Sequence, residues 1–259
     1  MKKVQTLVIA AGGRGSRIAN HFNKIHFRGS KVLFPIADKP FIGYLIDLAL
    51  ALKFRRVFLL TSHFEADIRR YMNTYYLGSK KVIVVYGGRK GRKFGVPYLL
   101  YSIRKSLKTP FIYTDGNILF APELLRRMQS GRLGKNSIAL AVSKRDYAPT
   151  HSRVTIADGE IKDIYVRLSK RKINRSSRQA VDYFSMGVMA IHPKVFSLCH
   201  DFAHKLDLDN VIKELYLRDS ELIKPVNYKK DWLAIHLRQD LDSAARQAPT
   251  LGVGESERT

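Results

Sequence analysis

Cysteine, acidic residues and long apolar runs are all scarce in this chain of 259 residues, and each scarcity excludes a class of protein. The single cysteine, Cys199, excludes a framework of internal disulfide bonds and favours a reducing compartment. No apolar run approaches the roughly 20 residues that a membrane-spanning helix needs. The first residues, MKKVQTLVIAAGG, lead from a short apolar run into glycines without a cleavage pattern, so they do not predict a signal peptide. We therefore expect a cytoplasmic protein with no membrane span.

The scarcity of acidic residues leaves the chain strongly basic. Its 22 Asp and Glu residues are outnumbered by 46 Lys and Arg, which gives a formal net charge of +24. This charge favours anionic partners, namely nucleotides, nucleic acid or a lipid surface, without choosing among them. The basic residues are spread along the chain, and it has no RNA-recognition signature, zinc pattern or basic heptad array. A dedicated nucleic-acid-binding protein is therefore not favoured.

What the chain does contain is a regular alternation of strand-like and helix-like segments. Hydrophobic residues make up 45% of it, which is enough to build a core. The first expected helix follows a start signal, Asp38 with Pro40 in the first turn. The expected strands of this half are 5–10, 56–62, 81–86, 110–114 and 137–143, and the further helices are 64–76, 96–107 and 121–130. The succession predicts an α/β fold with a Rossmann-like, mostly parallel sheet flanked by helices.

From about residue 145 the strand-like segments become shorter, which predicts a small antiparallel inserted layer. The segments 153–166 and 182–192 are strand-like, and Asp158 and Gly159 predict a turn within the first. Helices are expected at 194–203, at 208–217 and from about 238, with strand-like stretches at 221–227 and 231–236. We take residues 1–247 as a single domain and 248–259 as a disordered tail.

The first expected strand opens into a glycine loop, AAGGRGSR at 10–17. In a parallel sheet this is the carboxyl edge, where such folds bind ligands. Glycines let backbone N–H groups close around phosphate oxygens, and Arg14 and Arg17 add charge that a phosphate would neutralise. The loop lacks the Gly-Lys-Ser/Thr ending of a P-loop, and Ile18 stands where a dinucleotide fingerprint has its third glycine. We expect the loop to hold a nucleoside triphosphate; a structural turn without a ligand is the alternative.

Together with SKVLFPIADKPFIGYLID at 30–47, this loop resembles the signature of the sugar-phosphate nucleotidyltransferase family, a GGxGTRL loop followed by KPLLPVxxKPLI. Arg17 falls on the family's loop arginine, Ser16 on its threonine, and Lys31 on the lysine of the KP pair. Val32 replaces the proline that follows this lysine. Weaker matches along the chain extend the resemblance over about 5–246.

The resemblance implies a GT-A-like nucleotidyltransferase fold, in which residues 1–144 bind the nucleotide and 145–247 bind the acceptor. Its implied catalytic residues are Arg17 on the β- and γ-phosphates, Lys31 on the α-phosphate or acceptor phosphate, and Asp115 on Mg²⁺. The implied acceptor-binding residues are Gly187 and Arg167. The implied nucleotide-binding residues are Ala10, Ala11, Gly12, Gly13, Arg14, Gly15, Ser16, Arg17 and Gly95.

Two departures from the family pattern concern the acceptor side. Ala234 occupies the place of a second metal-binding aspartate, and Asp231, three residues earlier, is the alternative ligand if the strand is shifted. Magnesium needs only one or two carboxylates when phosphates and water complete its octahedron, so Asp115 alone is a sufficient set. Val166 and Arg167 stand where the family commonly has a Glu-Lys pair that holds the sugar, so we expect an unusual acceptor.

We therefore expect an enzyme that transfers a nucleoside monophosphate from an NTP to a sugar 1-phosphate, or a similar phosphorylated alcohol, and releases pyrophosphate. The alternative, motivated by Ala234, is a family member without catalysis that binds nucleotide or activated sugar and regulates a partner. The stretch RLSKRKINRSSR at 167–178 holds six Lys or Arg, and we expect a solvated loop there, with a clamp for an acidic acceptor as the alternative. A homo-oligomer is compatible with all of these expectations.

Overall fold

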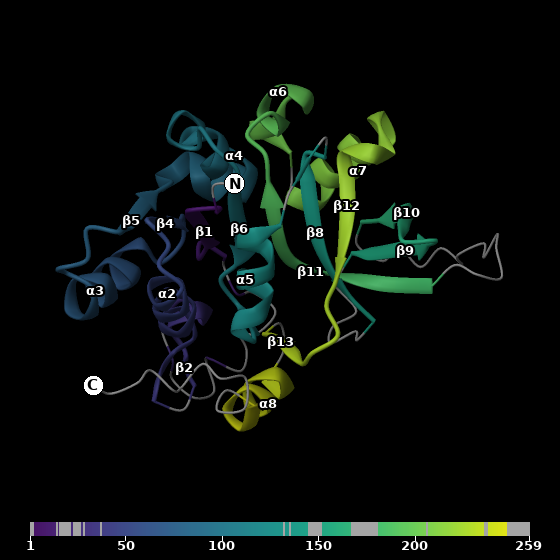
Figure 1. The fold of residues 1–259 in the computed structure, drawn as a ribbon. Coiled ribbons are helices and arrows are strands. Elements are labelled where there is room, and N and C mark those ends of the chain that lie inside the picture. The colour runs from purple at the N-terminus through teal and green to yellow at the C-terminus, as the bar shows by residue number, and fades with distance from the viewer. Residues whose placement is uncertain are drawn as a thin grey trace.

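The first half of the chain contributes four parallel strands to the main sheet. The computed structural model describes residues 3–13, 15, 22, 27, 29–36, 38–131, 133–134, 136–144, 152–166, 181–205, 207–235 and 238–247. The parallel strands are β1 (Thr6–Ala10), β4 (Arg56–Thr61), β5 (Val82–Tyr86) and β6 (Phe111–Asp115). They lie side by side in the order β6-β1-β4-β5 (Figure 1). The predicted mostly parallel sheet is therefore confirmed.

The second half of the chain extends this sheet with antiparallel strands. The long strand β11 (Val181–Ile191) runs antiparallel to β6 and also pairs with β8 (Ile138–Ser143) and β9 (Arg153–Ala157). Strand β10 (Glu160–Tyr165) pairs with β9 across the predicted turn, where Asp158 and Gly159 both have positive φ. Strand β12 (Ile223–Asn227) lies parallel to β8. The predicted antiparallel segments are thus a continuation of the main sheet at one side.

Helices cover both faces of the sheet, as the alternation of side chains along β1 illustrates. Leu7 and Ile9 point into a core with α2 (Phe41–Ala51), α3 (Glu65–Tyr75) and α5 (Pro122–Ser130). Val8 points the other way, into a core with α4 (Gly88–Ser102), α6 (Val195–Leu198) and α7 (Leu208–Arg218). Short 3₁₀ turns lie at η1 (Lys31–Leu33), η2 (Arg104–Ser106), η3 (Phe202–His204) and η4 (Ser220–Leu222). Figure 1 shows α2 and α5 in front of the strands.

Two small sheets and the last helix close a third core beside the end of β6. Strand β7 (Ile118–Phe120) pairs with β13 (Trp232–Ala234), and β2 (Pro35–Ile36) pairs with β3 (Lys39–Pro40). Helix α8 (Arg238–Gln247) packs here through Leu241 and Ala244. The expected tail at 248–259 lies outside the described residues.

Three helices differ most from those predicted. Helix α2 begins at Phe41 and Asp38 does not cap it, because the Asp38 carboxylate instead accepts a hydrogen bond from the Tyr44 hydroxyl, at 2.6 Å. Helix α4 begins at Gly88 instead of residue 96, and its two segments meet at Gly95, which has φ 70° and ψ −153°. The helix predicted at 194–203 ends at Leu198, because extended backbone at Cys199 and positive φ at Asp201 separate α6 from η3. No helix in the described part of the chain combines the length and apolar character needed to cross a membrane.

Candidate functional site

The glycine loop starts where β1 ends, between the ends of β4 and β6. The Gly116 backbone N–H donates to the Ala10 carbonyl at 2.7 Å, which ties the loop to the end of β6. On the other side, the Ser62 hydroxyl donates to the Gly12 carbonyl at 2.9 Å. A Cβ atom added at Gly12 would lie 2.6 Å from Ser62 Oγ and 2.7 Å from Ser62 N. Close packing against the end of β4 therefore requires glycine at this position.

Asp115 ends β6 beside this loop, and its carboxylate lies between a tyrosine and a glycine. The Tyr113 hydroxyl donates a hydrogen bond to Asp115 Oδ1, from two residues earlier on the same face of the strand. Gly187, with φ 65°, approaches from β11, and a Cβ atom added there would lie 2.5 Å from Asp115 Oδ2. Glycine thus keeps open the space beside the carboxylate oxygen that Tyr113 does not bind.

Burial and nearby charges have opposing effects on Asp115. Burial raises the pKa of its carboxyl above the ordinary value, and the Asp207 carboxylate adds to this increase. The Tyr113 hydroxyl and the Lys31 ammonium both lower the same pKa by stabilising the charged form. Burial also raises the pKa of the Tyr113 phenol, so that the phenol remains a protonated donor. The carboxylate is therefore held in a partly desolvated place with a cation near it.

Lys31 lies in η1 and reaches from the glycine loop to the end of β13. A Cβ atom added at Gly13 would lie 4.0 Å from Lys31 Cε, so the lysine stem passes next to the loop. Its ammonium donates to the Ile235 carbonyl at 3.4 Å, a carbonyl that also accepts from Asn117 Nδ2 at 2.8 Å. Residues 10–13, Lys31 and Asp115, which are distant in sequence, therefore converge at the carboxyl edge of the parallel strands.

Ala234 lies on β13 opposite Ile118 and is 0% exposed. Its methyl group belongs to the core under β1, so this position supplies no side-chain oxygen to the site. Asp231 is exposed and immediately precedes β13, whose last residue is Ala234. The two residues are three positions apart, which corresponds to about 10 Å of extended chain.

Within the described ranges, no group of three or more His, Cys, Asp or Glu side chains could hold a metal ion. Asp115 ends β6 at the carboxyl edge of the parallel strands, with its second carboxylate oxygen beside the backbone of Gly187.

A cavity of about 440 Å³ adjoins the glycine loop. The glycine loop, the end of β4, the first segment of α4 and the end of η3 all contribute to its wall. The phenyl ring of Phe94 and the imidazole ring of His204 meet edge to face at 5.2 Å between their centroids. The lining residues are Gly12, Gly13, Ser62, His63, Gly91, Arg92, Lys93, Phe94, Gly95, His204 and Lys205, which include three permanent cations and no carboxylate. The cavity therefore suits a planar group carried by an anion.

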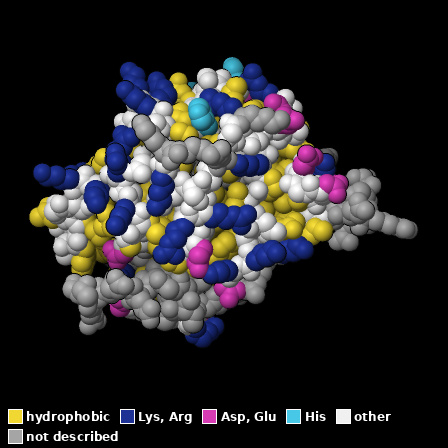
Figure 2. Space-filling model, in the orientation of Figure 1, with side chains coloured by type: hydrophobic (Ala, Val, Ile, Leu, Met, Phe, Trp, Pro, Cys, Tyr) yellow, Lys and Arg dark blue, Asp and Glu magenta, His cyan; other side chains and the backbone are white. Residues whose placement is uncertain are grey.

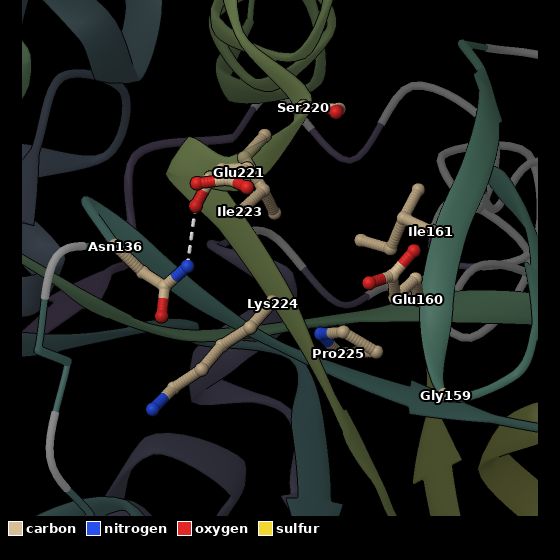
Figure 3. Close-up of a pocket in the computed structure, with 9 residues that line it drawn as sticks. All are labelled: Asn136, Gly159, Glu160, Ile161, Ser220, Glu221, Ile223, Lys224 and Pro225. Carbon is tan, nitrogen blue, oxygen red and sulfur yellow. Dashed lines mark hydrogen bonds between the residues drawn. The ribbon is translucent and has the colours of Figure 1, made fainter.

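A smaller cavity of about 260 Å³ lies elsewhere, between the start of β10 and the start of β12 (Figure 3). Its polar side chains include Glu160, Glu221 and Lys224, and the Lys224 ammonium points away from Glu160 in Figure 3. Asn136 donates to the Glu221 carbonyl at its rim. None of the residues that the sequence predicts for catalysis or binding lines this cavity, so it is not the candidate site.

Known proteins resemble the chain in sequence and in structure, although no protein-family profile matches it. In sequence it is 24% identical over 216 residues to the Bifunctional protein GlmU of Paracidovorax citrulli (strain AAC00-1), which is 82% of this chain and 42% of that protein. The chain thus spans less than half the length of this curated relative.

Three solved structures match nearly the whole chain. The inositol-1-phosphate CTP transferase from T. maritima has a TM-score of 0.76 at 20% identity, over 97% of this chain and 98% of that one. A putative glucose-1-phosphate thymidylyltransferase from Bacillus anthracis, in complex with a sucrose, has a TM-score of 0.76 at 16% identity, over 94% of each chain. A UDP-glucose pyrophosphorylase complexed with UDP-glucose has a TM-score of 0.72 at 14% identity, over 95% of this chain and 99% of that one. The chain has the sugar-phosphate nucleotidyltransferase fold.

Within this nucleotidyltransferase fold, the described residues among those predicted gather in one region. Ala10, Ala11, Gly12, Gly13, Lys31, Asp115 and Gly187 lie around the end of β1, and Gly95 lines the neighbouring cavity. Gly15 has φ 67°. Arg14, Ser16, Arg17 and Arg167 lie outside the described residues, as does the basic stretch 167–178.

Several residues of the site were missed by sequence reasoning. Tyr113 contacts Asp115, and its alternation with Asp115 on one strand face is a signal that could have found it. Arg92, Phe94 and His204 reach the cavity from α4 and η3, more than 100 residues apart, and no local pattern marks them as neighbours.

Proposed function

We propose that this protein is a nucleotidyltransferase that transfers a nucleoside monophosphate from an NTP to a sugar 1-phosphate, or a similar phosphorylated alcohol, with release of pyrophosphate. The observation that carries the proposal is the convergence of the glycine loop, Lys31 and Asp115 at one edge of a sheet with the nucleotidyltransferase fold. The three solved structures named above have names that describe such transfers or a pyrophosphorylase, which supports the same reaction class.

In this proposal the NTP lies across the glycine loop, with its base in the cavity beside Gly95 and its triphosphate next to Gly12 and Gly13. An oxygen of the acceptor phosphate attacks the α-phosphorus in line, the bond from that phosphorus to the β-phosphate oxygen breaks, and pyrophosphate leaves. Both reactants are anions, so the protein contributes mainly position and positive charge. Lys31 neutralises the α-phosphate or the acceptor phosphate, and Arg17 is assigned to the β- and γ-phosphates.

We assign Mg²⁺ as the cofactor and Asp115 as its protein ligand. When bound, the ion would neutralise charge on the reacting phosphates and orient them. The donor set agrees with this assignment, because a single carboxylate is enough when phosphates and water fill the remaining positions. Tyr113 holds one carboxylate oxygen and Gly187 leaves space beside the other. Asp231 would be a second ligand only if β13 were shifted, and the pairing of β13 with β7 is regular, so we do not assign Asp231 to the ion.

We assign the acceptor to the half formed by residues 145–247, with Gly187 and Arg167 as its contacts, and the nucleotide to residues 1–144. Gly187 lies against Asp115, so an acceptor phosphate bound there would face the same carboxylate as the nucleotide. A cytoplasmic location remains our expectation, and the buried free thiol of Cys199 is compatible with it.

The decisive test is a panel of NTPs against sugar and polyol phosphates, with detection of pyrophosphate. We expect magnesium-dependent release for at least one pair and its loss in Lys31→Ala and Asp115→Asn. Asp231→Asn is the matched control, because it makes the same substitution at the exposed carboxylate that precedes β13. Equal rates in Asp115→Asn and Asp231→Asn would contradict the assignment of Asp115, and no release with any pair would contradict the reaction.

Ala234 supports a second candidate function, a protein that binds nucleotide or activated sugar without turnover. Calorimetry that shows tight NTP binding, together with no pyrophosphate release across the panel, would favour it. The variant Ala234→Asp sharpens the test, because its carboxylate would be buried and unfavourable unless it finds a cation. A large gain in rate in this variant would show a metal site weakened by the natural alanine.

A further inference from the structure

The edge of the sheet opposite the glycine loop carries basic side chains from three neighbouring segments. Parallel strands share their amino-terminal edge, so the segments that enter β4, β5 and β6 lie together there. The segment 51–56 enters β4, 75–81 enters β5 and 103–110 enters β6, and none of the three contains Asp or Glu. We call this surface the basic edge.

Exposed cations occur in each of these segments. Arg55 immediately precedes β4, and Arg56 is its first residue. Lys80 and Lys81 immediately precede β5, and Lys105 lies in η2, before β6. All five side chains are exposed, and none of them has a carboxylate partner within the described part of the chain. Figure 2 shows on one face of the molecule how strongly Lys and Arg outnumber Asp and Glu.

Backbone hydrogen bonds show that the segments are contiguous. The Arg55 and Arg56 N–H groups donate to the Gln5 carbonyl, at 2.9 Å and 3.2 Å, and the Val57 N–H donates to the Lys81 carbonyl at 2.8 Å. Neighbouring strands lie about 4.8 Å apart, so the amino ends of β6, β1, β4 and β5 span about 15 Å along the edge. The electrostatic potentials of these cations therefore add along the edge.

Helices add little negative charge at this edge. The Asp47 carboxylate of α2 accepts a hydrogen bond from the Tyr76 hydroxyl, at 2.8 Å, and pairs with Lys39 at 2.9 Å. Helices α3 and α5 both have their acidic residues in the first turn, Glu65 and Asp67 in α3 and Glu123 in α5. The end of α5 lies at the basic edge, because the Val4 N–H donates to the Gln129 carbonyl at 3.0 Å. The acids of these helices are thus near the opposite edge, with the glycine loop.

Two exposed apolar side chains accompany the cations. Tyr75, the last residue of α3, and Leu77, which lies between α3 and β5, are 69% and 79% exposed, and Lys80 and Lys81 follow Leu77 after two residues. Tyrosine and leucine flanked by lysines are suited to the boundary between lipid headgroups and acyl chains. Nucleic acid would be attracted by the cations and could stack on Tyr75, but it would gain nothing from the exposed Leu77.

We propose that the basic edge is a docking surface for an anionic lipid bilayer. The cations attract the headgroups, and Tyr75 and Leu77 enter the interface. In this orientation the glycine loop and the cavity at Gly95 face away from the lipid, because they lie at the carboxyl edge of the same strands. Soluble nucleotides therefore keep access to the site while the protein is docked.

Sedimentation with vesicles tests this proposal on the full chain without any nucleotide, so that the outcome is independent of the proposed reaction. Vesicles of phosphatidylglycerol and phosphatidylcholine are compared with pure phosphatidylcholine at physiological salt. We expect binding to the anionic vesicles only. Each basic side chain near an anionic surface contributes about fivefold in affinity, so Arg55→Glu/Lys81→Glu is expected to lose at least tenfold.

The matched control is Arg89→Glu/Lys90→Glu, which makes the same change in net charge on exposed residues of α4 at the carboxyl edge. It is expected to bind vesicles nearly as the unmodified protein does. Tyr75→Ser/Leu77→Ser leaves the charge unchanged and is expected to lose severalfold. Thermal melting of each variant shows that it is folded.

Three results would overturn the proposal. Equal losses in the two charge variants would show attraction by net charge alone. Unchanged binding in Tyr75→Ser/Leu77→Ser would remove the apolar contribution that distinguishes a bilayer. Binding of RNA or DNA that depends on Arg55 and Lys81, without binding of vesicles, would assign the basic edge to nucleic acid.

Discussion

Replacement of Gly187 by alanine tests the geometry of the site most directly. Gly187 has φ 65°, in the left-handed region, and an added Cβ atom would lie 2.5 Å from Asp115 Oδ2 and 2.9 Å from Ile118 Cδ1. The left-handed conformation costs about 1–2 kcal/mol for a residue with a Cβ atom. In addition, the new methyl group must displace the carboxylate that we assign to the metal ion.

Gly159 supplies a matched control for this substitution. It has φ 77° at the β9–β10 turn, and no atom would lie within 4 Å of an added Cβ atom. Both alanine variants therefore carry similar backbone strain, which for a chain of this size corresponds to a melting temperature lower by about 2–8 °C. Only Gly187→Ala also moves Asp115, and a displacement of about 1 Å at a reacting centre can cost about 100-fold in rate.

The assay is pyrophosphate release by both variants at a temperature where both are folded, with thermal melting measured in parallel. We expect near-normal turnover in Gly159→Ala and a loss of about 100-fold in Gly187→Ala. Equal activity in the two variants would refute the placement of Gly187 against the functional carboxylate.

Three further predictions follow from the described contacts. Tyr113→Phe removes the hydrogen bond to Asp115 Oδ1 and is expected to reduce turnover or metal affinity by about 10–100-fold. Tyr76→Phe removes a 2.8 Å hydrogen bond to Asp47, away from the site, and should leave turnover and metal affinity unchanged. Similar losses in the two variants would contradict the conclusion that Tyr113 positions Asp115. The raised pKa of Asp115 means that the folded protein retains this proton as the pH rises above the ordinary value of 3.8. The free energy of unfolding therefore falls as the pH rises from 3.8 to the pKa of Asp115 in the folded protein. In chemical denaturation without metal, Asp115→Asn should remove this fall. Burial raises the pKa of the Cys199 thiol to about 12, so a thiol-specific reagent at neutral pH should react only after unfolding, and rapid labelling of the folded protein would argue against it.

The sequence predicts much of the fold because strands and helices of this type leave local signals. The apolar runs at β1, β4, β5, β6 and β8 were placed to within about one residue at each end, and the turn at Asp158 and Gly159 was predicted correctly. Local pattern failed at α4, whose first turns contain four basic residues and little apolar periodicity. It also failed between α6 and η3, where the backbone is extended at Cys199 and left-handed at Asp201, and the His200 N–H between them donates to Glu214 Oε1 at 2.9 Å.

For the candidate site, the glycine loop was predicted from its place after the first strand, and Lys31 and Asp115 were predicted from the resemblance to the family pattern. Tyr113 and the lining of the cavity at Gly95 were not, because these contacts join residues from different strands and helices. The burial of Ala234 likewise follows from its pairing with Ile118 and from the core around it, neither of which is visible in its neighbours along the chain.

By itself the amino-acid sequence determined the α/β alternation, the glycine loop at the end of β1 and the strong positive charge. Those properties reside in short segments and in composition, which are independent of distant contacts. Only the tertiary structure decided that Gly187 lies against Asp115, that Lys31 reaches Ile235, and that basic segments entering β4, β5 and β6 form one surface. Parallel strands place all their amino ends at one edge and all their carboxyl ends at the other, so the sheet separates the basic edge from the site.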